Sequence, residues 1–156
     1  MARLRPAGVD DPDSRALLTE YFAVRAAAFP GGGYRTVFPD PAAFVPPTGV
    51  FVVLEDDGGA AAGCGGIRQL PGFGDGTVYE VKHLFVRESG RGRGRGRRIL
   101  DDLERRAREA GATELVLDTH HTLTAAGALY ARSGFERIEP YNDNPNATRW
   151  YRKRLG

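Results

Sequence analysis

The sequence predicts an α/β (α+β) fold built on a mixed, mostly antiparallel β-sheet. Two observations carry this prediction. Residues 50–54 and 60–70 form apolar or small-residue runs joined by an Asp-Gly-Gly turn, a pattern typical of an antiparallel hairpin. Residues 78–119 then show a strand, a helix and a strand in succession, and such a unit places its two strands parallel. With 156 residues, the chain is expected to form one domain, residues 1–156, around a single core.

The N-terminal third is predicted to give one strand, one helix and a long loop. Residues 3–7 are a candidate first strand, and the Asp- and Ser-containing residues 10–14 provide the side chains that begin a helix. Apolar residues on one face carry that helix to about Ala28. Between residues 29 and 47, three consecutive glycines and five prolines break regular structure and leave room for one helical turn near residues 41–44. This loop is expected to shape a surface or to cover a site.

The remainder of the chain is predicted to contain two more helices and four more strands. The first of these helices follows the glycine-rich stretch, carries apolar residues at helical spacing and ends at Gly111. The second is expected to be capped by Thr122 or Thr124 and to end at Gly134. The strands are expected at residues 78–87, 115–117, 135–138 and 148–155. The last strand is expected to be exposed, with basic side chains outward, and offers an edge for pairing in a possible homodimer.

Alternation along residues 78–87 predicts two faces of this strand. One face is expected to carry Glu80, Lys82, Leu84 and Val86, and the other Val81, His83 and Phe85. A glutamate in the middle of a strand that faces partly inward needs either a function or an ion partner.

Composition limits the classes of partner and the compartment. The formal net charge of +2 does not by itself favour a nucleic-acid partner, and none is expected. A lone cysteine, Cys64, excludes an intramolecular disulfide and suits a reducing compartment. Neither a signal-peptide core nor a membrane-spanning apolar run is present, so the cytoplasm is the expected location and no membrane partner is expected.

Positive charge is concentrated in one stretch, where six arginines between residues 87 and 98 face the single Glu88. Gly92, Gly94 and Gly96 allow positive φ and close approach of backbone N–H groups, and the following helix adds its N-terminal partial charge. The stretch is therefore interpreted as a phosphate cradle. It lacks the Gly-Lys-Ser/Thr ending of a Walker A loop. A disordered nucleic-acid segment is the alternative, disfavoured because the stretch lies between a core strand and an amphipathic helix.

The pattern Arg91-x-x-Gly94-x-Gly96 resembles the acetyl-CoA loop of the GNAT superfamily of N-acetyltransferases, with similarity to bacterial members that act on small molecules or amino acids. Residues 80–87, 126–135, 63–66 and 141–145 resemble further family segments. The resemblance implies helices on both faces of the sheet and a central parallel pair that is splayed to admit the pantetheine arm. It also implies direct acetyl transfer from acetyl-CoA to a primary amine of a small molecule. The acceptor would approach between residues 29–47 and 140–146.

The resemblance also assigns roles to individual residues. Tyr130 matches the family's general acid, although it also fits a core aromatic. Glu80 matches a position where some members carry the general base, and an ion pair with Lys82 or an arginine is the open alternative. The expected cofactor contacts are backbone groups of the strand at Leu84, Phe85 and Val86, together with the loop residues Arg91, Gly92, Arg93, Gly94, Arg95, Gly96 and Arg97.

The remaining sequence-based expectations concern Arg95, residues 122–124, Cys64, the histidine pair and an alternative function. Arg95 stands where the family usually has an aliphatic residue, and residues 122–124 lack the asparagine that often contacts pantetheine. Cys64 is expected to be a buried, inert thiol rather than an acyl-carrying nucleophile. His120 and His121 lack a third ligand at metal-binding spacing and are expected at the surface or in the substrate pocket, with no metal. The alternative function is a non-catalytic module that senses acyl-CoA or binds nucleic acid through the Arg/Gly loop.

Overall fold

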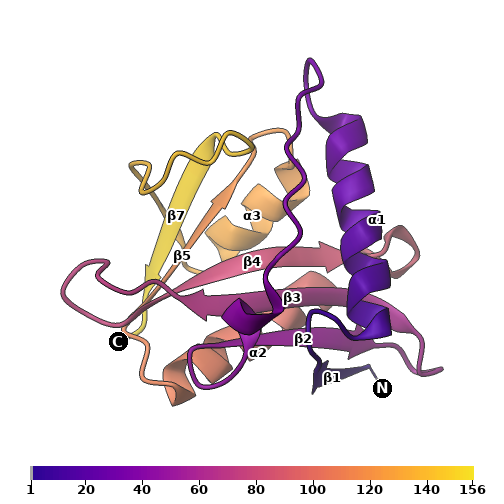
Figure 1. The fold of residues 1–156 in the computed structure, drawn as a ribbon, viewed down its shortest axis with the longest axis horizontal. Coiled ribbons are helices and arrows are strands. Elements are labelled where there is room, and N and C mark those ends of the chain that lie inside the picture. Colours follow the sequence, from indigo (N-terminus) through magenta and orange to yellow (C-terminus); the bar gives the residue numbers. More distant parts are fainter. Residues whose placement is uncertain (1) are drawn as a thin grey trace.

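The computed structural model describes residues 2–156 and centres on a seven-stranded sheet (Figure 1). In chain order the elements are β1 (Arg3–Pro6), α1 (Pro12–Ala28), η1 (Pro41–Phe44), β2 (Gly49–Glu55), β3 (Ala61–Gln69), β4 (Val78–Val86), η2 (Glu88–Gly90), α2 (Arg95–Glu109), β5 (Glu114–Thr119), α3 (Thr124–Arg132), β6 (Glu136–Ile138) and β7 (Arg149–Arg154). The strand order is β1-β2-β3-β4-β5-β7-β6, and β4 with β5 is the parallel pair. The predicted mixed, mostly antiparallel sheet is confirmed.

The N-terminal elements lie where the sequence predicts them. Helix α1 begins after Asp11, whose side chain accepts a hydrogen bond from the backbone N–H of Asp13 at 3.0 Å, with Pro12 in the first turn. It ends at Ala28, as the apolar spacing predicts. The long loop contains one short helical turn, η1, which confirms that expectation as well.

Helix α1 covers one face of the sheet and helices α2 and α3 cover the other (Figure 1), which confirms the predicted helices on both faces. Each face carries its own hydrophobic core. The α1 core contains Leu17, Leu18 and Phe22 of α1 with Phe44 of η1. The α2 core on the other face contains buried residues of α2 and α3 and the inward residues of five strands. The helices therefore fix the sheet from both sides.

The glycines of β3 allow close packing on both faces. A Cβ atom at Gly65 would lie 3.0 Å from Ile99 Cγ2 of α2, and one at Gly66 would lie 2.8 Å from Phe44 Cδ1 on the opposite face. Distances this short force a neighbouring group to move. The small-residue strand thus lets α2 and η1 approach the centre of the sheet.

The central parallel pair is short and then opens. Strands β4 and β5 pair at three register positions, Val78 with Glu114, Tyr79 with Leu115 and Glu80 with Val116. Beyond these positions β4 continues to Val86 and β5 to Thr119 without pairing to each other. The predicted splayed pair is confirmed.

A β-bulge in β4 corrects the predicted faces of this strand. Between paired positions, β4 advances from Lys82 to Phe85 while β3 advances only from Cys64 to Gly66, and His83 takes a left-handed φ of 60°. The extra residue reverses the alternation. Val81 packs in the α2 core together with Leu84 and Val86, whereas His83 and Phe85 face the aromatic rings of the α1 core. A single face carrying Glu80, Lys82, Leu84 and Val86 is therefore wrong.

Two further expectations are corrected. The last strand, β7, is not an edge but lies between β5 and β6, so the proposed pairing of its edge in a homodimer is wrong. Neither Thr122 nor Thr124 caps α3, because the N-cap residue is Leu123 and its side chain makes no capping bond. The Thr122 hydroxyl instead lies 2.7 Å from His120 Nδ1. Within residues 2–156, no helix combines the length and apolarity needed to cross a bilayer.

Candidate active site

A cleft of about 570 Å³ opens where β4 and β5 separate. Its walls come from residues 81–84 of β4, the end of β5, helix α1, residues 34–44, the start of α3 and residues 142–146. Both loops that are expected to border the acceptor thus line the cleft. This site collects segments from almost the whole chain.

The Arg/Gly stretch forms an open loop at the start of α2. Gly92 and Gly94 have φ values of 81° and 69°, the left-handed region that glycine adopts without strain. Gly94 is the N-cap and provides no side-chain hydrogen bond, so the first N–H groups of α2 lack a capping acceptor. Arg91 Nε donates to the Val86 carbonyl at 3.1 Å and ties the loop to the end of β4. An open helix N-terminus of this kind suits a phosphate group.

The arginine side chains of this stretch point in different directions. The Arg95 guanidinium lies against Gly90, so this atypical residue folds back over η2. Arg97 Nε pairs with Asp101 Oδ1 at 3.1 Å along the outside of α2. Arg93 is exposed. The open positions of this loop are therefore backbone groups rather than a ring of arginine side chains.

The end of β4 presents backbone groups to the opening between the strands. The Arg87 N–H donates to the Ala62 carbonyl of β3 at 2.8 Å. Because neighbouring residues of a strand point their backbone groups to opposite sides, the N–H of Val86 faces away from β3 and toward the splay. Leu84 lines the cleft, whereas the side chain of Phe85 is buried in the α1 core.

Tyr130 lies both in the core and at the cleft. Its ring packs against Phe135 and Tyr151, with centroids 5.9 and 5.8 Å away, and the side chain is 6% exposed. It also lines the cleft. Burial raises the pKa of the Tyr130 phenol, so the hydroxyl keeps its proton at neutral pH and remains a donor.

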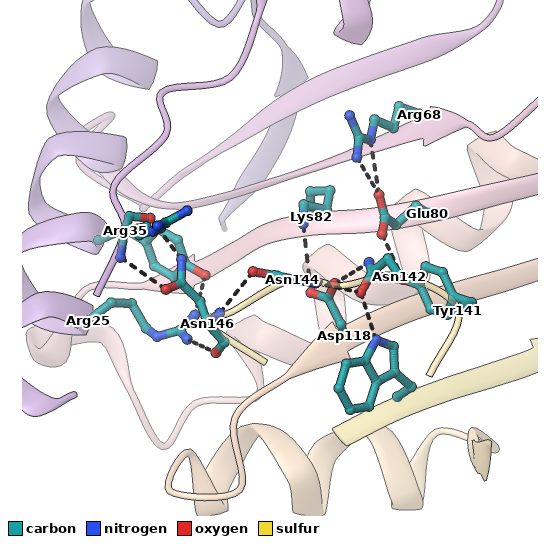
Figure 2. A network of polar contacts seen from close by, with 12 residues as sticks. Arg25, Arg35, Arg68, Glu80, Lys82, Asp118, Tyr141, Asn142, Asn144 and Asn146 are labelled. Carbon is teal, nitrogen blue, oxygen red and sulfur yellow. Dashed lines mark hydrogen bonds and ion pairs between the residues drawn. The ribbon is translucent and has the colours of Figure 1, made fainter. Parts of the chain in front are cut away.

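Glu80 is buried and fully bonded. Its Oε1 accepts from Arg68, at 2.9 Å from Nε and 2.8 Å from Nη2, and its Oε2 accepts from the Tyr141 hydroxyl at 2.6 Å (Figure 2). Of the two predicted ion partners, the structure places an arginine here and not Lys82. Glu80 lines a smaller hollow of about 290 Å³, beside Phe73 and Tyr141, rather than the main cleft.

Asp118, at the end of β5, holds the C-terminal loop against the cleft. Its Oδ2 accepts from Asn142 Nδ2 at 2.7 Å and from Asn144 Nδ2 at 3.2 Å, and its Oδ1 lies 3.7 Å from Lys82 Nζ (Figure 2). Trp150 Nε1 donates to Asn142 Oδ1 at 2.9 Å and fixes the amide orientation. Sequence reasoning assigned Asp118 no role and considered Lys82 only as an ion partner of Glu80. A carboxylate at the end of a parallel strand, followed by asparagines at alternate positions, is the signal that points to this network.

His83 lines the floor of the cleft, and Cys64 is buried beneath it. The imidazole of His83 packs against Phe22 and Phe44, and burial lowers its pKa to about 3. The Cys64 thiol donates to the His83 carbonyl at 3.5 Å, and burial raises its pKa. The predicted buried thiol is confirmed, and its raised pKa keeps it from acting as a thiolate nucleophile at neutral pH.

The histidine pair at the end of β5 adds no metal centre. His120 stacks on His121 with ring centroids 4.5 Å apart and lies 5.1 Å from the ring of Phe29. Across residues 2–156, no group of three His, Cys, Asp or Glu side chains is arranged to hold a metal ion. The imidazole of His120 is buried, and the exposed His121 lies at the surface.

Comparison with known proteins gives a consistent result. A family model described as the acetyltransferase (GNAT) family matches residues 15–135. An uncharacterized N-acetyltransferase of Schizosaccharomyces pombe is 36% identical over 100 residues, which cover 64% of this chain and 60% of that protein. Across the curated relatives that it matches, this chain spans between 32% and 60% of their length.

Solved structures share the whole fold. A candidate acyl-CoA N-acyltransferase from Klebsiella pneumoniae has a TM-score of 0.80 at 26% identity, covering 100% of this chain and 99% of that one. A GNAT-family acetyltransferase from Staphylococcus aureus has a TM-score of 0.83 at 18% identity with full coverage of both chains, a likeness of fold. The match to residues 15–135 spans more than half of the sequence, and with it the glycine loop and the splayed strands show that this chain belongs to the GNAT family of acetyltransferases.

Proposed function

We propose that residues 1–156 form one N-acetyltransferase domain, which moves an acetyl group from acetyl-CoA directly to a primary amine of a small molecule. The observation that carries the proposal is the continuity of three features. An open glycine loop at the N-terminus of α2 leads to the unpaired edge of β4, and that edge leads to a cleft lined by the protonated phenol of Tyr130.

Acetyl-CoA supplies an activated acetyl thioester. We assign its pyrophosphate to the backbone of residues 91–97 and its pantetheine arm to the β4 edge at residues 84–86. Arg91 holds the loop to Val86 and so sets the distance between the two binding regions. Arg97 is the arginine that can exchange its exposed partner Asp101 for a phosphate oxygen.

The proton balance assigns one task to each proposed catalytic residue. An ammonium acceptor must lose one proton before its nitrogen attacks and a second after the new C–N bond forms. As the C–S bond breaks, Tyr130 donates its proton to sulfur, and the second amine proton restores the phenol. Glu80 receives the first proton. Both of its oxygens are already bonded, and both Glu80 and Tyr141 line the smaller hollow, so this proton passes through water from the main cleft to the Tyr141 hydroxyl, which donates to Glu80 Oε2.

A direct assay tests the proposed activity. The purified chain is incubated with acetyl-CoA and a panel of primary amines, and the release of free CoA is measured together with the thermal midpoint. We expect CoA release with some amines and a stabilisation of about 2.7 kcal/mol when acetyl-CoA is at a hundred times its dissociation constant.

The same measurements separate the alternatives. Stabilisation by acetyl-CoA without turnover on any amine would identify a sensor instead of an enzyme. Salt-dependent binding of oligonucleotides without any response to CoA would identify a nucleic-acid module. The cytoplasm and the absence of membrane and nucleic-acid partners stay predictions, and a homodimer has no assigned surface.

A further inference from the structure

The charges that line the cleft do not balance. The lining side chains include the cations Arg25, Arg35, Arg68 and Lys82 and the carboxylates Asp40 and Asp118. Arg68 is neutralised by Glu80, and Lys82 lies 3.7 Å from Asp118. Within residues 2–156, neither Arg25 nor Arg35 has a carboxylate at ion-pair distance, and the remaining lining carboxylate, Asp40, accepts a hydrogen bond from the Ala42 N–H. The two guanidiniums therefore leave unpaired positive charge at one end of the cleft.

Arg25 is held in place by neutral groups. Its guanidinium lies over the ring of Tyr34, with the carbon 5.0 Å from the centroid, and 5.8 Å from that of Tyr21. One terminal nitrogen donates to the Tyr21 hydroxyl at 3.0 Å and the other to the Asn146 carbonyl at 3.3 Å. Burial raises the pKa of Tyr34 to about 12, so this phenol is no counter-ion at neutral pH. Three of the five guanidinium N–H groups are left for a ligand.

The C-terminal loop also holds the backbone of Arg35, an exposed residue that lines the cleft. Its backbone N–H donates to Asn146 Oδ1 at 3.0 Å, and Asn146 Nδ2 donates back to the Arg35 carbonyl at 2.7 Å. One asparagine therefore contacts both arginines. Figure 2 shows Arg25, Arg35 and Asn146 together on one side, with Lys82 and Asp118 between them and the Arg68–Glu80 pair.

We propose that the acceptor is an amine that also carries a carboxylate, and that Arg25, assisted by Arg35, binds this carboxylate. The proposal rests on the proposed acetyl transfer and names its substrate class. A fixed guanidinium with free N–H groups matches the two oxygens of a carboxylate. The net positive lining works against polyamines and other polycationic acceptors.

The remaining lining defines the rest of the acceptor. Five aromatic side chains from α1, the following loop and η1 line the cleft, namely Tyr21, Phe22, Tyr34, Phe38 and Phe44. An apolar side chain would be buried against these rings. Amino acids with an apolar side chain therefore fit the charge and the lining best, with the amine directed toward Tyr130.

The test compares acceptors that differ only in the carboxylate. Initial rates of CoA release are measured with phenylalanine and with 2-phenylethylamine, and with leucine and its decarboxylated amine. We expect kcat/KM to be about tenfold to a hundredfold higher for the amino acid of each pair, mainly through KM. An aminophosphonate analogue is included. A preference for it over the amino acid would show that the site recognises a phosphonate or phosphate group, and would overturn recognition of a carboxylate.

Variants locate the effect. Arg25→Gln should remove most of the preference by lowering kcat/KM much more for the amino acid than for the decarboxylated amine, and Arg25→Lys should retain only part of the preference. Arg15→Gln is the matched control, because Arg15 also lies on α1 over an aromatic ring, 4.7 Å from the centroid of Phe38, but does not line the cleft.

Each outcome is decisive. Equal kcat/KM within each pair in the wild-type protein, or an equal loss for both members in Arg25→Gln, overturns the carboxylate site but leaves acetyl transfer standing. If no amine supports CoA release, acetyl transfer fails, and calorimetric titration with phenylalanine then tests the site alone. Binding in the wild-type protein that Arg25→Gln abolishes supports the site, and absence of binding overturns it.

Discussion

The donor side and the acceptor side of this molecule are built in different ways. The proposed donor site is a contiguous stretch, residues 84–97, and its groups are mostly backbone atoms exposed by glycines. The acceptor cleft is made of side chains from α1, β3, β4, β5 and the C-terminal loop. A backbone site keeps its geometry when exposed side chains change, whereas a side-chain site depends on every partner. We therefore expect substitutions on the two sides to separate cofactor binding from acceptor recognition.

The largest effect is expected at Tyr130, where the two sides meet. Tyr130→Phe removes the proton donor and should lower kcat by about a hundredfold or more, with little change in acetyl-CoA affinity. Because burial raises the pKa of the phenol, kcat of the wild type should not fall between pH 8 and 10 through loss of this proton. Steady-state kinetics over this pH range check both statements.

Tyr79→Phe is the matched control for Tyr130. Tyr79 is equally buried in the α2 core, but its hydroxyl donates to the Pro47 carbonyl at 2.9 Å and does not reach the cleft. It should lose about 1 kcal/mol of stability with kcat unchanged. Equal losses of kcat and cofactor affinity in Tyr130→Phe would assign Tyr130 a packing role instead.

The next largest effect is expected at Asp118. In Asp118→Asn, an amide oxygen that still accepts from Asn142 and Asn144 turns the new NH2 group toward Lys82 Nζ, and the opposite orientation leaves both asparagine donors unpaired, so the contacts of residues 141–146 with β5 should weaken. We expect the acceptor KM to rise about tenfold and stability to fall by about 1–3 kcal/mol, with the acetyl-CoA dissociation constant unchanged. Calorimetry with acetyl-CoA and kinetics with the acceptor separate the two sides.

Glu80→Gln gives the comparison for Asp118→Asn. If Glu80 is the base, kcat/KM should lose its rise with pH on the acidic side, because the base must be deprotonated to accept the amine proton. The profile of Asp118→Asn should keep this rise. The opposite pattern would make Asp118, the carboxylate that lines the main cleft, the base.

A smaller effect is expected at His83, which lies between the two sides. Burial lowers the pKa of its imidazole to about 3, whereas a histidine in an unfolded chain titrates near about 6.5. Between these values the unfolded chain binds the proton, so the free energy of unfolding falls as the pH is lowered. His83→Asn keeps a residue that tolerates the left-handed backbone and should reduce the loss between pH 6.5 and 4.5 by about 2 kcal/mol. Urea unfolding at the two pH values measures it, and an unchanged loss would contradict the burial of a neutral imidazole.

The smallest effect is expected at Arg97. Its ion pair with Asp101 joins side chains that are 49% and 58% exposed, so Arg97→Gln should cost less than about 0.5 kcal/mol in stability. Acetyl-CoA affinity should fall less than about fivefold, and the difference should vanish at high salt. A loss far above this would show that side chains, and not the backbone, provide most of the donor site.

Local patterns in the sequence predict most of the fold. The spacing of apolar residues predicts helix α1 and its end at Ala28, and the proline-rich loop leaves room for the short helix η1. The strand–helix–strand pattern predicts the parallel pair. The β-bulge at His83 could not be predicted in this way, because it depends on how two strands pair. The insertion of β7 between β5 and β6 likewise depends on contacts that no local pattern encodes.

In the candidate site, too, the features that could be predicted are local in sequence, and those that could not depend on distant contacts. The glycine loop can be recognised because its residues are consecutive. The partners of Glu80 and Arg25 are far away in the chain, because Tyr141 is 61 positions after Glu80 and Asn146 is 121 positions after Arg25. The family resemblance supplies candidate roles for Glu80 and Tyr130. It gives no information on which side chains contact these two residues.

The position of β7 has a consequence for synthesis of the protein. The final strand must enter between β5, which precedes it by thirty residues or so, and β6, and only then does the loop before it reach α1 through Asn146. During translation the nascent chain can therefore complete the glycine loop while the acceptor cleft is still open. We therefore expect a chain truncated before β7 to bind CoA although it cannot yet select an amine.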